Sequence, residues 1–381
     1  MSTFSEIYRT LPVEALVQQS LDTSGRTLDP VLRRGRALTL TDFAALLSPA
    51  AGEHLETLCQ HSQALTRKHF GKTIRLFAPL YLSNECVNIC KYCGFSRNNP
   101  IPRITLPVDK VVAEAELLAK QGFRSILLVA GEHPKFVSNG YVEDIIERLL
   151  PIMPSVLLEI APLETEPYRP FVRAGCEGLV VYQETYHQPT YEELHTAGPK
   201  RKFFWRMDAP ERAYAAGFRR LGIGALYGLY NWRHDAIALA AHALHLTRRC
   251  WKAQISISLP RMRPAAGGFQ QKEFMQDREL VQTLCALRLL LPHAQFVLST
   301  REPAHLRDGL VTLGVTTMSA GASTEPGGYS SFDETSWTPT REQSGEQFHI
   351  SDERPPKVIA DMIARQGYEP VWKDFDLALV K

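Results

Sequence analysis

Short apolar runs rich in Val, Ile and Leu alternate with amphipathic stretches along most of the chain. The runs lie at residues 74–82, 125–130, 156–160, 178–182, 221–226, 254–259, 295–299 and 315–319. Helices are predicted between them, at 109–121, 141–150, 208–216, 235–249 and 277–291, several with an aspartate at the N-cap or in the first turn. This alternation predicts parallel strands joined by crossover helices. We therefore expect an α/β fold, a TIM-type (β/α)8 barrel rather than an open barrel of six strands.

The two ends of the chain depart from this repeating pattern. Residues 1–70 precede the first run, and we expect them to form a helical extension. Residues 71–325 hold the barrel pattern. After about residue 325 the sequence becomes rich in Gly, Ser and Thr, and a short helix is predicted at 356–366. We expect residues 326–381 to cap the barrel.

Polar residues gather where the predicted strands end. Active sites of this fold lie at the C-terminal ends of the strands, so these residues are candidates for the site. They are Cys86, Cys90 and Cys93 after the first run, Glu132 after the second, Glu159 in the third, Gln183 after the fourth, Arg301 after the seventh, and Ser319 and Ser323 at the eighth. Each alone is compatible with a solvated loop residue. Their joint placement on one rim predicts a catalytic site.

Cys86, Cys90 and Cys93 place three thiols at spacings of four and three. A structural zinc site closes with four ligands, and an ordinary [4Fe–4S] cluster binds four thiolates, so a trio indicates a cluster with one iron left open. Two alternatives remain. The same spacing marks one face of a buried helix, although the flanking Ser, Asn, Gly and Pro residues favour a loop. A zinc ion could instead take its fourth ligand from His54, His61 or His69.

The composition narrows the class of protein. Hydrophobic residues make up 44% of the 381 residues and the formal net charge is +2, which gives no reason to expect a nucleic-acid partner. No apolar run is long enough for a membrane span, and the first residues lack the order of a signal peptide. An odd number of cysteines, seven, argues against a disulfide framework. We expect a cytoplasmic enzyme that binds no membrane.

The cysteine loop, with Gly94 and Phe95 after it, resembles that of the radical S-adenosylmethionine (SAM) superfamily. Further stretches resemble the 2-iminoacetate synthase family, the tyrosine lyases of thiamine thiazole synthesis. They are PLYLSNECVNICKYCGF (79–95), VYQETYH (181–187), FFWR (203–206), LSTRE (298–302), PGGY (326–329) and PVWKD (370–374). Neighbouring families are the hydrogenase-maturation tyrosine lyase and the tryptophan lyases. The maturase has a second cysteine cluster near its C-terminus, whereas no cysteine follows Cys285 here.

This resemblance implies a [4Fe–4S] cluster on the three cysteines and SAM on its open iron. It implies that Phe95 packs on adenine and that Glu132 meets the amino group of SAM. It also suggests Glu159 and Gln183 for the ribose hydroxyls and Arg206 for the SAM carboxylate. The implied reaction cleaves the Cα–Cβ bond of L-tyrosine and gives 2-iminoacetate, p-cresol, 5'-deoxyadenosine and methionine.

A tyrosine carboxylate needs a planar cationic clamp, and Arg301 is the best candidate by type and position. Ser319 and Ser323 are candidates to complete that clamp, and Tyr92, Tyr182 and Tyr186 to line an aromatic pocket. The alternative for Arg301 is an ion pair with Glu302 or Asp308. The unstable imine product implies a complex with thiazole synthase, and the cluster implies a flavodoxin or ferredoxin as reductant.

Overall fold

The computed structural model describes residues 2–134, 140–333, 335–340 and 345–373. Within these residues, eight parallel strands close into a barrel because the last of them, β10, pairs with β1. In order around the barrel they are β1 (Thr73–Ser83), β3 (Ser125–Ala130), β4 (Ser155–Glu159), β5 (Gly178–Glu184), β7 (Arg220–Ala225), β8 (Gln254–Ser258), β9 (Gln295–Leu298) and β10 (Thr317–Ser319). All eight predicted runs are strands, and the predicted (β/α)8 barrel is confirmed.

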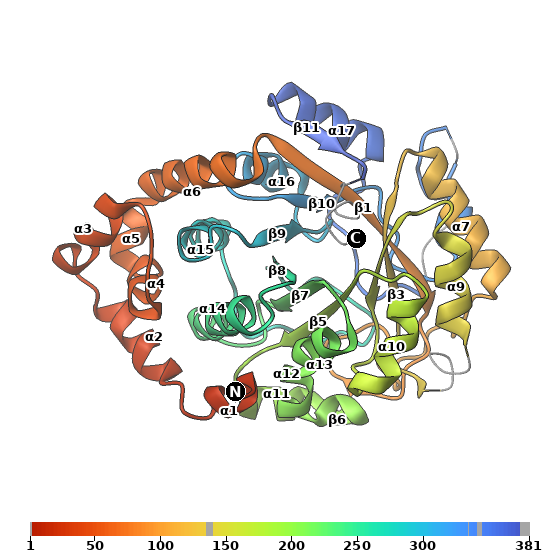
Figure 1. Ribbon diagram of the computed structural model, residues 1–381, viewed down its shortest axis with the longest axis horizontal. Coiled ribbons are helices and arrows are strands. Elements are labelled where there is room, and N and C mark those ends of the chain that lie inside the picture. Colours follow the sequence, from red (N-terminus) through yellow and green to blue (C-terminus); the bar gives the residue numbers. More distant parts are fainter. Residues whose placement is uncertain (1, 135–139, 334, 341–344, 374–381) are drawn as a thin grey trace.

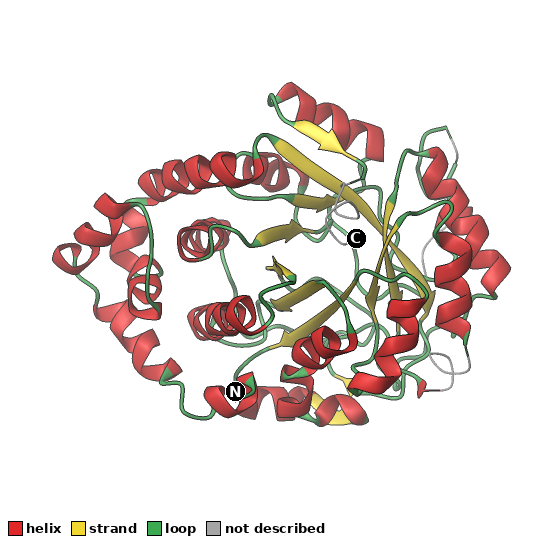
Figure 2. Cartoon of the chain, in the orientation of Figure 1, coloured by secondary structure: helices red, strands yellow, loops and turns green. Residues whose placement is uncertain are grey.

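Helices surround the barrel, as Figure 2 shows. Along the chain they are α7 (Val108–Lys120), α9 (Tyr141–Leu149), α10 (Thr165–Arg173), α11 (Gln188–Leu194), α12 (Phe203–Met207), α13 (Ala209–Ala216), α14 (Trp232–Arg249), α15 (Asp277–Leu290) and α16 (Ala304–Val311). The five predicted barrel helices agree with α7, α9, α13, α14 and α15 to within three residues. The sequence patterns did not predict α10, α11, α12 or α16.

A layer of N-terminal helices covers one side of the barrel. They are α1 (Phe4–Tyr8), α2 (Val13–Asp22), α3 (Gly25–Arg34), α4 (Leu40–Leu46), α5 (Pro49–Glu53) and α6 (Leu55–Phe70). Figure 1 shows α2 to α6 as an arc outside α14 and α15, where α2 packs on α14 and α6 on α15. Side-chain caps start several of these helices; the Ser48 hydroxyl, for example, accepts a hydrogen bond from the N–H of Ala51 (3.0 Å).

The C-terminal region contributes at two places. Its helix α17 (Pro356–Arg365) and strand β11 (Glu369–Val371) lie beside the start of β1, with which β11 pairs (Figure 1). Residues 345–350, in contrast, cross the mouth of the barrel, where Gln347 and Phe348 line a cavity. A short 3-10 helix, Tyr329–Ser331, comes before them. Residues 334, 341–344 and 374–381 of the predicted capping region lie outside the described residues, and the predicted domain boundaries remain predictions.

Among the described residues, no helix combines the length and apolar composition that a membrane span requires.

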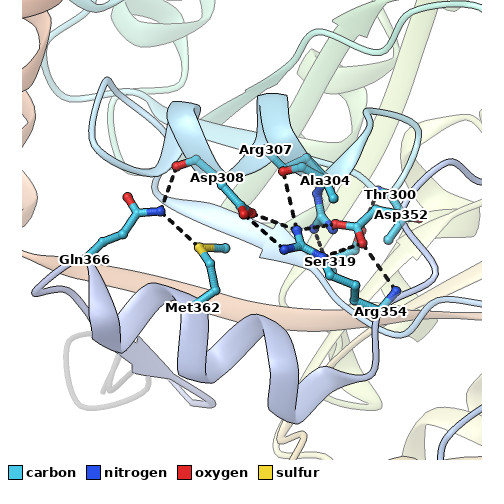
Figure 3. A network of polar contacts seen from close by, with 9 residues as sticks. All are labelled: Thr300, Ala304, Arg307, Asp308, Ser319, Asp352, Arg354, Met362 and Gln366. Carbon is cyan, nitrogen blue, oxygen red and sulfur yellow. Dashed lines mark hydrogen bonds and ion pairs between the residues drawn. The ribbon is translucent and has the colours of Figure 1, made fainter.

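A buried ion pair connects the C-terminal region to the barrel (Figure 3). The Arg307 guanidinium on α16 donates to the Asp352 carboxylate and to the Ser319 carbonyl, and neither side chain of the Arg307–Asp352 pair is exposed. Arg354 donates to both Asp352 (2.8 Å) and Asp308 (2.7 Å). The N–H groups of Ser351 and Asp352 donate to the Thr300 carbonyl. This network therefore joins the chain after Phe348 to the ends of β9 and β10.

Replacing Arg307 with Met should lower the free energy of unfolding by about 3 to 5 kcal/mol, because it leaves Asp352 buried with a single cation. Arg148→Met is the control, since Arg148 pairs with Asp109 at the surface, with side chains 42% and 86% exposed, and should cost at most about 1 kcal/mol. Urea denaturation of both variants measures the difference. Equal losses would contradict the fastening role of Arg307.

Candidate active site

The loop that follows β1 carries the three cysteines and is held in shape by one arginine. The Arg103 guanidinium donates to the carbonyl oxygens of Asn84, Phe95, Ser96 and Asn99 at 2.6 to 3.2 Å. Four carbonyls that face one cation fix the start and the end of the loop together. The cysteines thus stand on an ordered loop and not on a helix, which removes the buried-helix alternative.

Backbone contacts seat this loop on the barrel rim. Its strand β2 (Ile89–Cys90) pairs antiparallel with β6 (His195–Ala197). A Cβ at Gly131 would lie 2.2 Å from the carbonyl oxygen of Glu85, so only glycine fits at the end of β3. On the other side, the N–H of Gly94 donates to the Gln347 carbonyl (3.0 Å). Three segments distant in sequence therefore set the position of the thiols.

One cavity, which we call the thiol cavity, is lined by all three cysteines. Phe95, Glu132, Glu159 and Arg206 line it too, so four of the five residues predicted to bind SAM are brought together with the predicted cluster ligands. Phe95 is 2% exposed and packs edge-on against Tyr81, with ring centroids 5.7 Å apart. Burial raises the pKa of the Cys93 thiol to about 11.

Four charged side chains form a balanced set beside the thiols. Arg206, on α12, donates to Glu132 (2.7 Å), and Lys200, in the short 3-10 helix Pro199–Arg201, donates to Glu184 (2.7 Å). The amide of Asn88 in the thiol loop also donates to Glu132 (2.8 Å). Burial alone would raise the pKa of Glu132, but the charges of Arg206 and Lys200 outweigh it and lower this pKa. Two carboxylates and two cations are thus kept ionised in a buried site.

Gln183 is the one predicted SAM ligand that the structure does not bring into the thiol cavity. Its amide donates to the Phe203 carbonyl (3.3 Å) behind β5. Side chains alternate along a strand, so Tyr182 and Glu184 face the barrel interior while Gln183 faces the helices. Glu184 takes the predicted place and has a φ of 70°, a conformation that is costly outside glycine.

Glu159, at the end of β4, lies where the thiol cavity meets a second cavity. Burial and the nearby Glu184 carboxylate raise the pKa of Glu159 from 4.5 to about 7. This carboxyl group therefore differs from Glu132 and Glu184, whose pKa values are lowered by their cation partners.

The second cavity, which we call the Arg301 cavity, continues from the first into the barrel mouth. Cys93, Val129, Glu159, Tyr182, Glu184, Lys200 and Gln347 line both cavities. Arg301 and Ser319 line the second one, as predicted for a clamp, together with Ser258, Met262 and Phe348. The candidate substrate residues therefore face a space that opens onto the thiols.

Arg301 has no carboxylate partner among the described residues. Both alternatives considered for it are taken, because Glu302 binds Arg261 and Arg263, while Asp308 binds Arg354. The guanidinium instead lies over the ring of Phe348, with Cζ 3.3 Å from the ring centroid. Burial lowers the pKa of Arg301. A guanidinium that makes no ion pair with a described carboxylate is suited to an incoming anion.

The two predicted serines differ in position. The Ser319 hydroxyl lines the Arg301 cavity and accepts a hydrogen bond from the N–H of Thr300 (3.1 Å). Ser323 lies outside both cavities, packed so closely on Gly328 that a Cβ there would come within 1.8 Å of the Ser323 hydroxyl. The chain turns after β10, so a residue four positions on no longer points into the barrel. The structure thus brings Ser319 and not Ser323 to Arg301.

Two of the three candidate tyrosines line the Arg301 cavity, namely Tyr92 and Tyr182. Tyr92 donates to Nε2 of His195 (2.8 Å), since Nδ1 of His195 faces the Tyr191 carbonyl (2.7 Å) and is assigned the proton. Burial lowers the pKa of His195 to about 3, which keeps its imidazole neutral. Tyr186 lies elsewhere, with its hydroxyl 2.8 Å from His242.

Four residues that shape the two cavities were not among the predicted ligands, namely Glu184, Lys200, Gln347 and Phe348. Glu184 could have been found from its alternation with Tyr182. Lys200, Gln347 and Phe348 follow no strand and no periodic pattern, and their place depends on long-range contacts.

Two family models match the sequence. The radical SAM superfamily matches residues 80–241, and the biotin and thiamin synthesis associated domain matches residues 258–369. A 2-iminoacetate synthase of Escherichia coli (strain K12) is 41% identical over 99% of this chain and 97% of its own length. The chain belongs to the 2-iminoacetate synthase family. A member of this family from Salmonella typhimurium is 40% identical over the same shares. The FeFe-hydrogenase maturase HydG from Carboxydothermus hydrogenoformans has a similar structure, with a TM-score of 0.88 and 31% identity over 98% of this chain and 85% of HydG.

Enzymes of the radical SAM superfamily use a [4Fe–4S] cluster and SAM, and the residues present fit both. No three His, Cys, Asp or Glu side chains in the described ranges converge as ligands of a single metal ion. A cluster differs, because each thiolate binds its own iron atom, and three thiols around one cavity suit it. Among the histidines considered for zinc, His61 packs near Gly35 and His69 packs edge-on against His293. The zinc alternative therefore has no support in the structure.

Replacing Cys86, Cys90 or Cys93 with Ala should abolish cluster binding, because an incomplete set of thiolates cannot hold a stable cluster. Iron and sulfide content after anaerobic reconstitution measures this. Cys176→Ala is the control, since Cys176 is a buried free thiol elsewhere in the barrel and its loss should affect stability alone. Full iron content in the triple alanine variant would rule out the ligand assignment.

Replacing Glu159 with Gln should make the stability of the cofactor-free protein less sensitive to a rise in pH from about 5 to about 8. The folded wild type retains a proton on Glu159 that the unfolded chain releases between pH 4.5 and about 7, so the wild type loses stability as the pH rises through this window. Relative to the wild type, the variant should gain on the order of 1 to 3 kcal/mol between pH 5 and pH 8. Urea denaturation at both pH values measures this gain. The exposed Glu166→Gln variant should show none.

Proposed function

We propose that this protein is a radical SAM carbon–carbon lyase that cleaves L-tyrosine into 2-iminoacetate and p-cresol, with formation of 5'-deoxyadenosine and methionine, and so supplies the thiazole of thiamine. The observation that carries this proposal is the half-buried Arg301, which makes no ion pair with a carboxylate among the described residues and faces the cavity next to the thiols. The 41% identity to a 2-iminoacetate synthase over almost the whole chain supports it.

In this proposal Cys86, Cys90 and Cys93 hold the cluster and Glu132, Arg206, Phe95 and Glu159 hold SAM. When bound, the cluster and SAM supply a 5'-deoxyadenosyl radical that can take hydrogen from an unactivated bond. The pair Glu132–Arg206 presents an anion and a cation side by side, which complements the ammonium and carboxylate groups of an amino acid. Phe95 offers an apolar wall for adenine. Glu159 and Glu184 offer acceptors for ribose hydroxyls.

Arg301 binds the carboxylate of tyrosine, and Ser319 orients it. A guanidinium binds a carboxylate through two parallel hydrogen bonds, so it fixes direction as well as distance. That direction decides which hydrogen of the substrate lies near the thiol cavity. The C-terminal residues Gln347 and Phe348 line this cavity at the barrel mouth. In this proposal they help to exclude water, which protects a reactive radical from side reactions.

Anaerobic incubation of the reconstituted enzyme with SAM, a reductant and L-tyrosine tests the proposal directly. We expect p-cresol, 5'-deoxyadenosine and glyoxylate, the hydrolysis product of the imine. Formation of 5'-deoxyadenosine without p-cresol would contradict tyrosine as the substrate. The likeness to HydG makes another radical SAM aromatic amino acid lyase the second candidate, and L-tryptophan in the same assay examines it.

We further propose three features of the cellular context. The imine hydrolyses readily, so a stable or transient complex with thiazole synthase would shorten the distance that the imine travels. Co-sedimentation of the two proteins tests this complex. Independent sedimentation would argue against a stable complex. A flavodoxin or ferredoxin would deliver electrons, and replacing dithionite by each in the assay identifies the donor. All seven cysteines are free, which suits the reducing cytoplasm; cell fractionation checks this location.

Arg301→Lys keeps the charge but loses the paired hydrogen bonds, at a cost of about 1.5 to 3 kcal/mol. The KM for tyrosine should then rise about tenfold to a hundredfold, while the cluster content and the affinity for SAM stay unchanged. 5'-Deoxyadenosine should form in excess over p-cresol. Arg249→Lys, at a partly exposed position, is the control. Loss of SAM affinity with normal tyrosine affinity would place Arg301 in the SAM site instead.

A further inference from the structure

The segment that carries Phe348 is fixed to two parts of the barrel mouth. The N–H of Gln347 donates to the Thr324 carbonyl (3.0 Å), and the Thr324 hydroxyl donates to the Phe348 carbonyl (2.8 Å). On the opposite side, the Gln347 carbonyl accepts from Gly94 in the thiol loop, and its side chain accepts from the Tyr81 hydroxyl (2.8 Å). This segment is therefore part of the cavity wall, held on both flanks.

The ring of Phe348 is the surface on which the Arg301 guanidinium rests. The centroid of the ring lies 3.3 Å from Cζ of Arg301, well inside the range of a cation–π contact. A ring stacked on the face of a guanidinium leaves the N–H groups at its edge free. Phe348 can thus fix the plane of Arg301 without using the donors that a carboxylate needs.

The network in Figure 3 joins chain segments that lie next to Phe348 and Arg301 in sequence. Asp352, four residues after Phe348, binds Arg307, and Arg307 binds the carbonyl of Ser319. The N–H of Asp352 donates to the carbonyl of Thr300, the residue before Arg301. The same Thr300 donates its N–H to the Ser319 hydroxyl. The chain segments that bear Phe348, Arg301 and Ser319 are therefore tied to one another.

We propose that Phe348 is a positioning residue for the substrate carboxylate: its ring holds the Arg301 guanidinium in the plane in which both N–H groups reach that carboxylate. The inference rests on the proposed function of Arg301 as the carboxylate clamp. It makes the C-terminal region part of the substrate site, in addition to its role as a cover.

The test compares Phe348→Leu, which removes the ring, with Phe348→Trp, which keeps an aromatic face. Phe348→Leu should raise the KM for tyrosine about threefold to thirtyfold with a much smaller change in kcat, and Phe348→Trp should restore most of the loss. Equilibrium dialysis of tyrosine against the SAM-loaded enzyme, without reductant, should show the same order of affinities in the absence of turnover. Phe332→Leu, a buried aromatic of the same region outside both cavities, is the matched control.

A double-mutant cycle of Phe348→Leu with Arg301→Lys separates the proposed role of Arg301 from the proposed role of Phe348. If Arg301→Lys leaves tyrosine affinity unchanged, the proposed role of Arg301 fails. If Arg301→Lys weakens tyrosine binding but Phe348→Leu does not, or if Phe348→Leu weakens it equally in the Arg301→Lys background, the inference about Phe348 alone is wrong. Should Phe348→Leu fail to fold, Phe348→Met removes the ring at similar volume and takes its place in every comparison.

Discussion

The contact between the thiol loop and the barrel rim is the constraint on which the rest of the site depends. At Gly131 the carbonyl of Glu85 comes so close that a side chain is excluded, and at Gly94 a Cβ would lie 2.5 Å from the Glu346 carbonyl. Backbone packed on backbone allows little adjustment, because neither side has a rotamer to change. The thiol positions are therefore set by β3 and by the C-terminal segment. A shift in either one moves the three thiols, the proposed cluster ligands, directly.

The charged side chains of the two cavities suit the proposed binding of SAM and tyrosine close together. Beside the thiols, Glu132 with Arg206 and Glu184 with Lys200 form two ion pairs whose charges cancel. These four side chains have no net charge together, but each of them can still interact with one charged group of a zwitterion. Arg301 differs, since no described carboxylate lies in ion-pair contact with it. The guanidinium is already partly desolvated in the folded protein, so it would favour an anionic ligand such as the carboxylate proposed here.

The sequence predicted the barrel well, because its strands are buried on both faces and appear as continuous apolar runs. It also predicted the thiol loop, since the three cysteines are close in sequence. The predictions were weaker where the direction of a side chain decided whether it lines a cavity. Gln183 and Glu184 are neighbours at the end of one strand, and only the register of that strand decides which one faces the cavity. Ser323 lies beyond the end of β10, where the alternation of strand residues no longer applies. Gln347 and Phe348 could not be found, since they reach the site through contacts more than twenty residues away in sequence.

The C-terminal region connects these points, because the same short segment touches both halves of the site. Gln347 packs against the thiol loop at Gly94, and Phe348, the next residue, packs against Arg301. A peptide bond fixes the spacing of these two contacts to a single residue, so the thiol side and the carboxylate side cannot drift apart independently. The buried Arg307–Asp352 pair then ties this segment to β10, which closes the barrel against β1, the strand that leads into the thiol loop. The distance between the thiols and Arg301 is thus held by a closed circuit of contacts. The C-terminal segment is one link of this circuit, so it cannot move away from the barrel mouth without disturbing both sides of the site.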